Sequence, residues 1–302
     1  MPAGTNLVGL CVAKNEADII EAMVRHNLGY LDHLHVVDND SADATPGILA
    51  SLQAEMDGRL NWSVDRRAGH GQQAIINEVL PKLGSDTDAA QVVLLDADEF
   101  IRAERDAFRT ALLAYDGPVQ LPWVTYIPTG RDDPADRNPI SRIRYRRRRE
   151  VPPFNKITVP RQLIGQAQVA AGNHSLFGHK RIGGVAIAGL SLAHFPVRSR
   201  EQLLSKVLIG SWNIRLRDKA TQNEASHWQV LADRILAGDT LSQADVQGLA
   251  VSYSANASVR IILDPLVSPQ PVALRYTPDN KALLENNLIA FAESCVRQLV
   301  QG

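Results

Sequence analysis

The chain has 302 residues, of which 45% are hydrophobic and 22% are charged, as in a globular protein with a sizeable core. Its 32 basic and 33 acidic side chains give a formal net charge of −1, which excludes nucleic-acid binding driven by bulk positive charge. Two cysteines are too few for a disulfide framework, and neither a signal peptide nor a run of roughly 18 apolar residues is visible. We therefore expect a cytoplasmic protein without a transmembrane segment.

The first half of the chain alternates between short apolar runs and amphipathic segments. Strands are predicted at 6–12, 33–38, 60–67 and 91–98, and helices between them at 16–30, 41–56 and 71–83. Such alternation is typical of a mostly parallel sheet covered by helices. Polar clusters follow each strand, at 14–16, 38–43, 65–71 and 96–99. In open sheets of this class, ligands bind beyond the carboxyl ends of the strands, so these clusters predict one shared site.

The pattern changes after about residue 115. Further strands are predicted at 118–128, 141–149 and 155–165, and Ser199 and Gln202 have the spacing of a helix-capping box. Residues 222–250 and 281–300 have helical patterns. We therefore predict an α/β domain over residues 1–220, which would carry the shared site, and a helical C-terminal extension over 221–302, packed on that domain.

The fourth predicted strand ends in acids, in the stretch "VVLLDADEF" at residues 92–100. Asp96 and Asp98 are one residue apart, so on an extended strand end their carboxylates project to the same side. Because close like charges repel, burying such a pair requires a compensating cation, and Mg²⁺ or Mn²⁺ prefers carboxylate oxygens. The alternative is a solvated acidic turn or a helix cap.

Two stretches, "CVAKNEADIIEAMVRHNLGYLDHLHVVDNDSADAT" and "VVLLDADEF", together resemble nucleotide-sugar glycosyltransferases of the GT-A fold. The likeness is to the family-2-like branch, whose members carry a Lys/Arg-Asn-Glu start and an Asp-x-Asp-Glu-Phe strand end. It extends over about residues 6–210 and includes "GNHSLF" and "HFPVRSREQLLSK". The resemblance implies a Rossmann-like GT-A domain that transfers a sugar, with inversion, from a UDP-linked donor to a glycan or glycolipid acceptor.

The same resemblance assigns roles to individual residues. Asp96 and Asp98 would hold Mn²⁺ or Mg²⁺ against the donor diphosphate, and Glu99 would orient the site or face the acceptor. Nucleotide contacts fall on the first three polar clusters, at Asn15, Glu16, Asp38, Asn39, and Arg66 or Gln73. Asn15 would brace its loop. The chain departs from the usual pattern in having Asn39 in place of an aspartate and Asp40 in place of a glycine, which puts the identity of the base in question.

Later residues complete the predicted site. His194 closes an apolar run and is predicted to be a third metal ligand, with a buried, backbone-bonded histidine as the alternative. His174 competes with it, for the metal or for the acceptor pocket. Lys156 and Arg198 match the family pattern and would offer positive charge to the diphosphate, unless they are ordinary solvated charges.

The run "SRIRYRRRRE" carries the strongest positive charge in the chain. As a strand it would place Arg142, Arg144 and Arg146 on one side, which is typical of a solvated edge strand. An alternative is peripheral contact with anionic lipid headgroups at the inner face of a membrane.

No acidic pair between residues 150 and 200 identifies the general base that inverting transfer requires, so inverting and retaining transfer both stay open, although the resemblance favours inversion. Glu99, Glu201 and Glu150 are candidates, and His174 is another. Two further functions stay open from the sequence. A nucleotidyltransferase shares the metal and the nucleotide but needs a glycine-rich loop that "AKNEAD" lacks, and an inactive sugar-nucleotide-binding protein would keep the fold alone.

Overall fold

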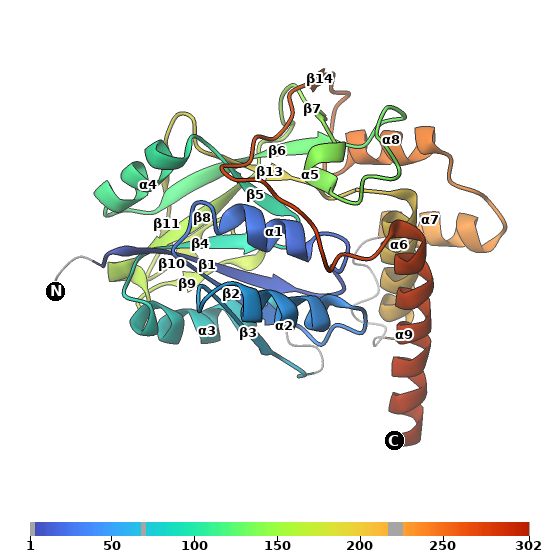
Figure 1. Ribbon diagram of the computed structural model, residues 1–302, viewed down its shortest axis with the longest axis horizontal. Coiled ribbons are helices and arrows are strands. Elements are labelled where there is room, and N and C mark those ends of the chain that lie inside the picture. The colour runs from blue at the N-terminus through green and yellow to red at the C-terminus, as the bar shows by residue number, and fades with distance from the viewer. Residues whose placement is uncertain (1–3, 68–70, 217–225, 302) are drawn as a thin grey trace.

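The computed structural model describes residues 4–67, 71–216 and 226–301. Its centre is a parallel sheet made from the first half of the chain (Figure 1). The four strands are β1 (Asn6–Ala13), β2 (His33–Asp38), β3 (Leu60–Val64) and β4 (Ala89–Asp96). They lie in the order β3-β2-β1-β4, each parallel to its neighbour, so their carboxyl ends share one edge. The predicted α/β class with a mostly parallel sheet is confirmed.

The strands after β4 extend the sheet with mixed directions. β8 (Asn155–Pro160) pairs antiparallel with β4, and β6 (Val119–Ile127) pairs with β8. The outer and branching strands are β5 (Glu99–Arg102), β7 (Tyr145–Arg147), β12 (Val185–Ala186), β13 (Ser191–His194) and β14 (Ile261–Leu263). A separate small sheet contains β9 (Gln168–Val169), β10 (Leu176–Phe177) and β11 (Arg181–Ile182). Chain reversals after β4 thus bring late segments back beside the acidic strand end.

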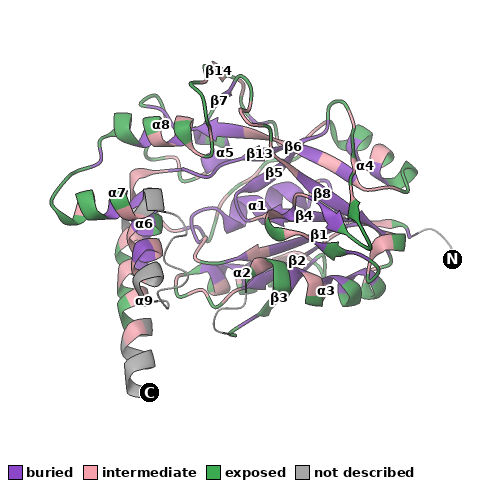
Figure 2. Ribbon diagram, turned by 180° about the vertical axis from the view of Figure 1, so that it is seen from behind, coloured by how far each residue is buried: buried purple, intermediate pink, exposed green. Residues whose placement is uncertain are grey.

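Helices cover both faces of the sheet. α1 (Ile20–Asn27), α2 (Thr45–Glu55) and α4 (Arg105–Ala114) pack on one face, and α3 (Gln72–Asp86) packs on the other. Figure 2 shows that burial is concentrated in the central strands and in α1. No helix within the described ranges is long and apolar enough to cross a membrane.

The later helices form a group at one end of the sheet. They are α5 (Pro139–Arg142), α6 (Arg200–Leu216), α7 (Ser226–Leu236), α8 (Gln243–Ser252) and α9 (Asn280–Gln301). The predicted start of a helix after Ser199 is confirmed, because the Ser199 hydroxyl accepts the Gln202 amide at 3.1 Å. The predicted helical segment 222–250 lies partly outside the described residues and is otherwise α7 and α8. The division at residue 220 stays a prediction, and β14 adds a strand to the part beyond it.

The predicted solvated edge strand at 141–149 is wrong. Its first residues form α5, and Arg142 is buried with its guanidinium donating to the backbone oxygen of Arg198 at 3.1 Å. β7 is not an edge either, because β14 pairs with it, and Asp264 just after β14 binds Arg146 at 2.7 Å. No local pattern indicates that a segment more than 100 residues away covers this strand.

Glu21 on α1 fixes the C-terminal segment to the core. Its side chain is 0% exposed and accepts the backbone amides of Arg275, Tyr276 and Thr277, each at 2.8 Å. Burial raises the pKa of this carboxyl, but the amides outweigh burial and the net pKa is lowered. In Figure 1 the segment that leads to α9 crosses α1 at this point. The Glu21 carboxylate therefore anchors residues 275–277, which lie shortly before α9 begins at Asn280.

We expect Glu21→Gln to lower the free energy of unfolding by roughly 2–4 kcal/mol, because a neutral amide leaves buried N–H donors unpaired. Chemical denaturation measures the change. The control is Glu285→Gln, an exposed acid on α9, which should stay within about 0.5 kcal/mol of the parent protein. Equal stability of the two variants would contradict the role assigned to Glu21.

Candidate active site

The acidic motif forms a tight turn between β4 and β5, and we call residues 96–99 the carboxylate turn. The Glu99 carboxylate accepts the Asp96 amide at 2.8 Å, which closes the turn. Asp98 is 7% exposed and Glu99 is 0% exposed, while the Asp96 side chain keeps 30% of its surface in solvent. The solvated-turn alternative is therefore wrong for Asp98 and Glu99, which lie inside the protein.

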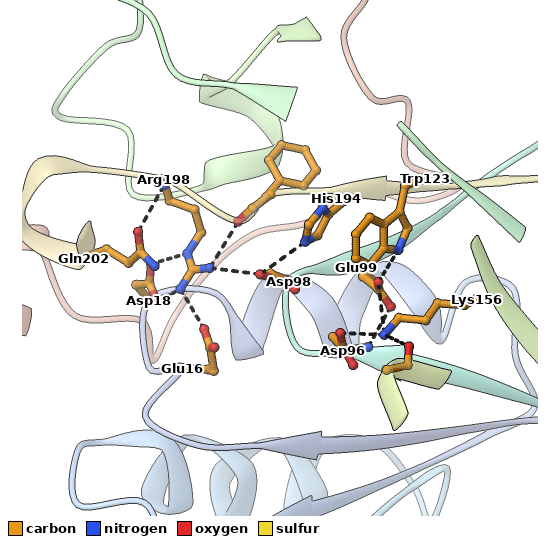
Figure 3. Close-up of polar contacts among 12 residues, drawn as sticks. Glu16, Asp18, Asp96, Asp98, Glu99, Trp123, Lys156, His194, Arg198 and Gln202 are labelled. Atoms are coloured by element: carbon orange, nitrogen blue, oxygen red, sulfur yellow. Dashed lines mark hydrogen bonds and ion pairs between the residues drawn. The ribbon is translucent and has the colours of Figure 1, made fainter. Parts of the chain in front are cut away.

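Lys156 on β8 neutralises one side of the carboxylate turn (Figure 3). Its ammonium lies 2.6 Å from Asp96 Oδ2 and 3.6 Å from Glu99 Oε1, and it donates to the backbone oxygen of Gly172 at 3.0 Å. Burial lowers the pKa of Lys156, but Glu99 and Asp96 outweigh burial and raise it. A buried lysine that stays charged can hold two acids close together.

Two residues that the sequence did not single out complete this side. Trp123 on β6 donates its indole N–H to Glu99, and Gln72, the first residue of α3, donates to Asp96 Oδ1 at 2.6 Å. With both oxygens of Glu99 engaged and no exposed surface, the geometry favours the orienting role over contact with an acceptor. No local sequence pattern marks Trp123 or Gln72, because their partners are distant along the chain.

Arg198, just before α6, neutralises the other side (Figure 3). It is 3% exposed, and its guanidinium binds both oxygens of Asp18 at 2.6 and 2.8 Å and Glu16 Oε2 at 2.7 Å. Its Nη1 lies 3.8 Å from Asp98 Oδ2. Arg198 therefore connects the loop after β1 to the carboxylate turn. Asp18 was not predicted, although it lies in the same "KNEAD" segment as Glu16.

Glu16 is the most strongly perturbed acid on this side. Burial, Asp98 and Asp18 raise its pKa, Arg198 and Lys206 lower it, and the net pKa is about 7. An acid with such a pKa changes its charge near neutral pH.

Asp98 and His194 face each other without a hydrogen bond. His194 Nε2 lies 3.7 Å from Asp98 Oδ2, and the ring stacks on Trp123 with centroids 4.2 Å apart. His194 Nδ1 is buried and has no hydrogen-bond partner among the residues that the structure describes. Burial lowers the pKa of His194 to about 4, so the imidazole is neutral at neutral pH. A neutral buried imidazole beside an ionised carboxylate is the arrangement from which metal ligands are drawn.

The fit of a metal ion differs among the predicted ligands. Within the described part of the chain, no three His, Cys, Asp or Glu side chains group so that they could hold one. Asp96 does not join the other two, because Lys156 and Gln72 hold its carboxylate. Asp98 and His194 fit a metal ion better, because a carboxylate and a neutral imidazole face each other at 3.7 Å. Their surroundings also carry more acids than buried cations, since Arg198 and Lys156 face the five carboxyl groups of Glu16, Asp18, Asp96, Asp98 and Glu99.

The predicted nucleoside residues lie on neighbouring loops at the same edge of the sheet. Asn15 braces its loop as expected. Its side-chain Oδ1 accepts the backbone amide of Ala42 at 2.8 Å, and its backbone amide donates to the Ser41 hydroxyl. Asp38 is 1% exposed, and no residue in the described ranges forms a hydrogen bond with its Oδ1. Asn39 follows it, and its backbone oxygen accepts Lys14 at 2.9 Å. These loops leave a buried acceptor atom at Asp38.

The third polar cluster contributes differently from the prediction. Gln73 turns to the backbone oxygen of Val169 at 3.1 Å, and its neighbour Gln72 reaches Asp96 instead. Arg66 has a side chain 79% exposed, with Asp40 at 4.0 Å as its ion-pair partner. The contact of Gln73 and Arg66 with a nucleotide stays a prediction. The contact of Lys156 and Arg198 with a diphosphate also stays a prediction, and acids enclose both of these cations.

The predicted general bases His174 and Glu201 lie outside the carboxylate turn. His174 Nδ1 donates to the backbone oxygen of Asn155 at 2.6 Å, and its ring contacts Trp123 edge-on. Glu201, in the first turn of α6, lies 3.7 Å from Arg200. Their catalytic roles stay predictions.

A comparison with protein families shows to which family the chain belongs. The profile of glycosyl transferase family 2 matches residues 10–165, just over half of the chain, from the second half of β1 to just beyond β8, and this stretch includes the carboxylate turn. The chain belongs to glycosyl transferase family 2. The family-2 resemblance and the enzyme class predicted from the motifs are thereby confirmed, and this family-2 chain is a glycosyltransferase.

Solved structures give a weaker likeness. The family-2 chain is similar to S. aureus TarS 1-349 in complex with UDP-GlcNAc, at 12% identity and a TM-score of 0.41, over 82% of this chain and 79% of that one. It is also similar to the mannosyltransferase PcManGT from Pyrobaculum calidifontis in complex with GDP-Man and Mn²⁺, at 15% identity and a TM-score of 0.42, over 96% and 86%. A search of curated proteins gave no match. Likenesses this weak do not establish a shared substrate.

We expect Lys156→Met to lower the free energy of unfolding by roughly 3–5 kcal/mol, because it leaves Asp96 and Glu99 without their buried cation. Lys82→Met, which removes an exposed lysine on α3, is the control and should stay within about 0.5 kcal/mol. Urea unfolding of both variants measures the difference. An unchanged Lys156→Met protein would show that the carboxylate turn does not depend on this ion pair.

Glu16 predicts a pH dependence of stability. Its pKa is near 4.5 in the unfolded chain and about 7 in the folded protein, so the folded state holds the proton longer and stability falls as pH rises between these values. Glu16→Gln removes this fall. We compare the free energy of unfolding of the variant with that of the parent protein at each pH. We expect this difference, variant minus parent, to be roughly 1–3 kcal/mol larger at pH 8 than at pH 5. The same difference at both pH values, in chemical denaturation, would contradict the raised pKa.

Proposed function

We propose that the enzyme is a metal-dependent glycosyltransferase that moves a sugar from a UDP-linked donor to a hydroxyl group of a glycan or glycolipid, with inversion. One observation carries the metal dependence. The buried carboxylate of Asp98 has no hydrogen-bond partner among the described residues and faces the neutral imidazole of His194 at 3.7 Å. Family membership supplies the reaction class.

In this proposal Asp98 and His194 hold Mn²⁺ or Mg²⁺, and Asp96 stands beside them at the more exposed edge of the turn. The bound ion would stabilise the negative charge that develops on the leaving diphosphate. Two features of the chain support this assignment. His194 is neutral and therefore able to bind a metal, and although burial raises the pKa of Asp98, its surroundings outweigh burial and lower that pKa, so its carboxylate stays ionised.

The nucleoside is assigned to the loops after β1 and β2. Asp38 Oδ1 offers a buried hydrogen-bond acceptor without a partner, and Asn15, Glu16 and Asn39 lie on the same loops. The choice of UDP rests on the resemblance of residues 37–45. Lys206, an exposed lysine of α6 beside Glu16 and Arg198 in a pocket wall, is better placed than either enclosed cation to meet a diphosphate.

The acceptor side is less determined by the geometry. His174 and Glu201 are the proposed bases, while Glu99, enclosed by Trp123 and the Asp96 amide, is proposed to orient the turn. We place the enzyme in the cytoplasm on its cysteine content and motifs, with peripheral contact at a membrane where the acceptor is a glycolipid.

The test is a thermal-shift screen of UDP-sugars, GDP-mannose, UDP and ATP, each with and without Mn²⁺. We expect a UDP-sugar to stabilise the protein only with Mn²⁺, by about 2.7 kcal/mol at a concentration 100-fold above Kd. Asp98→Asn should lose this metal-dependent part, and the exposed control Asp116→Asn should keep it. Each variant is compared with its own ligand-free melting temperature.

Three outcomes would contradict the proposal. Equal stabilisation with and without Mn²⁺ would contradict the metal requirement. A response to ATP but to no sugar nucleotide would favour nucleotidyl transfer. Binding of a UDP-sugar without release of UDP in the presence of any glycan acceptor would favour an inactive binding protein.

A further inference from the structure

A pocket of about 180 Å³ opens beside the carboxylate turn, between the loop after β1, α6 and α9. Of these walls, the loop at residues 14–18 alone lies within the stretch matched to family 2, and α6 and α9 lie beyond it. The volume is below the roughly 300–1,000 Å³ of pockets for drug-sized ligands, so it suits a single ring rather than a whole nucleotide.

Asn287 on α9 lines this pocket and carries a buried polar atom that no described residue pairs with. The side chain is 5% exposed, its amide nitrogen donates to the Ser205 hydroxyl on α6 at 2.9 Å, and its Oδ1 accepts no hydrogen bond within the described part of the chain. If the oxygen and nitrogen of the amide are interchanged, one of the two still lacks a partner. Leaving such an atom unsatisfied is costly, which points to a ligand that completes it.

The other walls define the chemistry of that ligand. Glu16 and Asp18 present carboxylates, Lys206 an ammonium group, and Ile209 and Leu283 apolar surface. Hydrogen-bonding groups on several sides together with apolar patches suit a polyhydroxylated ring, which has hydroxyl groups at its rim and C–H groups on its faces. Arg198 binds Glu16 and contacts Asp98, so the pocket adjoins the proposed metal ligand.

We propose that this pocket binds one sugar ring and that Asn287 recognises one of its hydroxyl groups. The proposal rests on the glycosyltransferase function proposed above and assigns specificity to α9, outside the family-matched stretch. The ring belongs either to the transferred sugar of the donor or to the acceptor, and the two sources share the same hydroxyl chemistry.

The experiment compares the parent protein with Asn287→Ala, with Asn286→Ala as the matched control and with Ser205→Ala. Asn286 is the same residue type one position earlier on α9 and is exposed. Ser205→Ala removes the α6–α9 hydrogen bond but leaves the Asn287 amide in the pocket. Calorimetry with Mn²⁺ measures the Kd of UDP and of UDP-glucose, UDP-galactose and UDP-N-acetylglucosamine, and of methyl hexosides in the presence of UDP.

If the donor sugar occupies the pocket, Asn287→Ala should weaken the preferred UDP-sugar roughly three- to tenfold and leave UDP unchanged. If the acceptor occupies it, the same loss should fall on a methyl hexoside while the UDP-sugar is unaffected. In both cases Asn286→Ala should bind like the parent protein, and Ser205→Ala should lose less than Asn287→Ala.

The proposal is overturned if Asn287→Ala binds every sugar like the parent protein. It is also overturned if UDP is weakened as much as the sugars, or if Ser205→Ala and Asn287→Ala lose affinity and melting temperature equally, since Asn287 would then only join two helices. A parent protein that binds neither nucleotide sugars nor hexosides would overturn both this inference and the proposed function. The results on the variants overturn this inference alone.

Discussion

The candidate site depends on the pairing of two buried cations, Lys156 and Arg198, with acids at one edge of the sheet. Burying an isolated charge costs several kcal/mol, so neither the acids nor the cations could occupy this place alone. Lys156 holds the carboxylate turn through Asp96, and Arg198 ties the turn to the loop that carries Glu16. The position of each acid therefore depends on a cation from a distant part of the chain.

The sheet topology explains why these cations arrive where the acids are. Parallel strands β1, β2 and β4 end at a common edge and deliver only polar loops and carboxylates there. Lys156 comes from β8, which runs antiparallel to β4, and Arg198 follows β13, which pairs with β5 directly after the turn. The matched family stretch thus supplies the acids and one cation, and the segment after it supplies Arg198 and His194.

Local patterns explain what the sequence could predict. Strands β1 to β4 and the pair Asp96 and Asp98 follow from alternation and from polar strand ends, which are readable within a short window. Local patterns do not show contacts between distant segments, and it was the family resemblance that placed Lys156, Arg198 and His194 in the site. In the first turn of α3 the predicted residue was Gln73, whereas the adjacent Gln72 contacts Asp96, because adjacent helical residues point about 100° apart. Arg142 was misassigned for the same reason: its burial depends on neighbours from distant segments.

The C-terminal residues belong to the site rather than standing apart from it. Glu21 lies five residues after Glu16 and binds the backbone amides of residues 275–277, shortly before α9 begins. The same short stretch of chain therefore carries one wall of the pocket and fixes the origin of the helix that carries Asn287 on the opposite wall. Arg198 lines this pocket and also lies 3.8 Å from Asp98, so the pocket and the carboxylate turn share one buried cation.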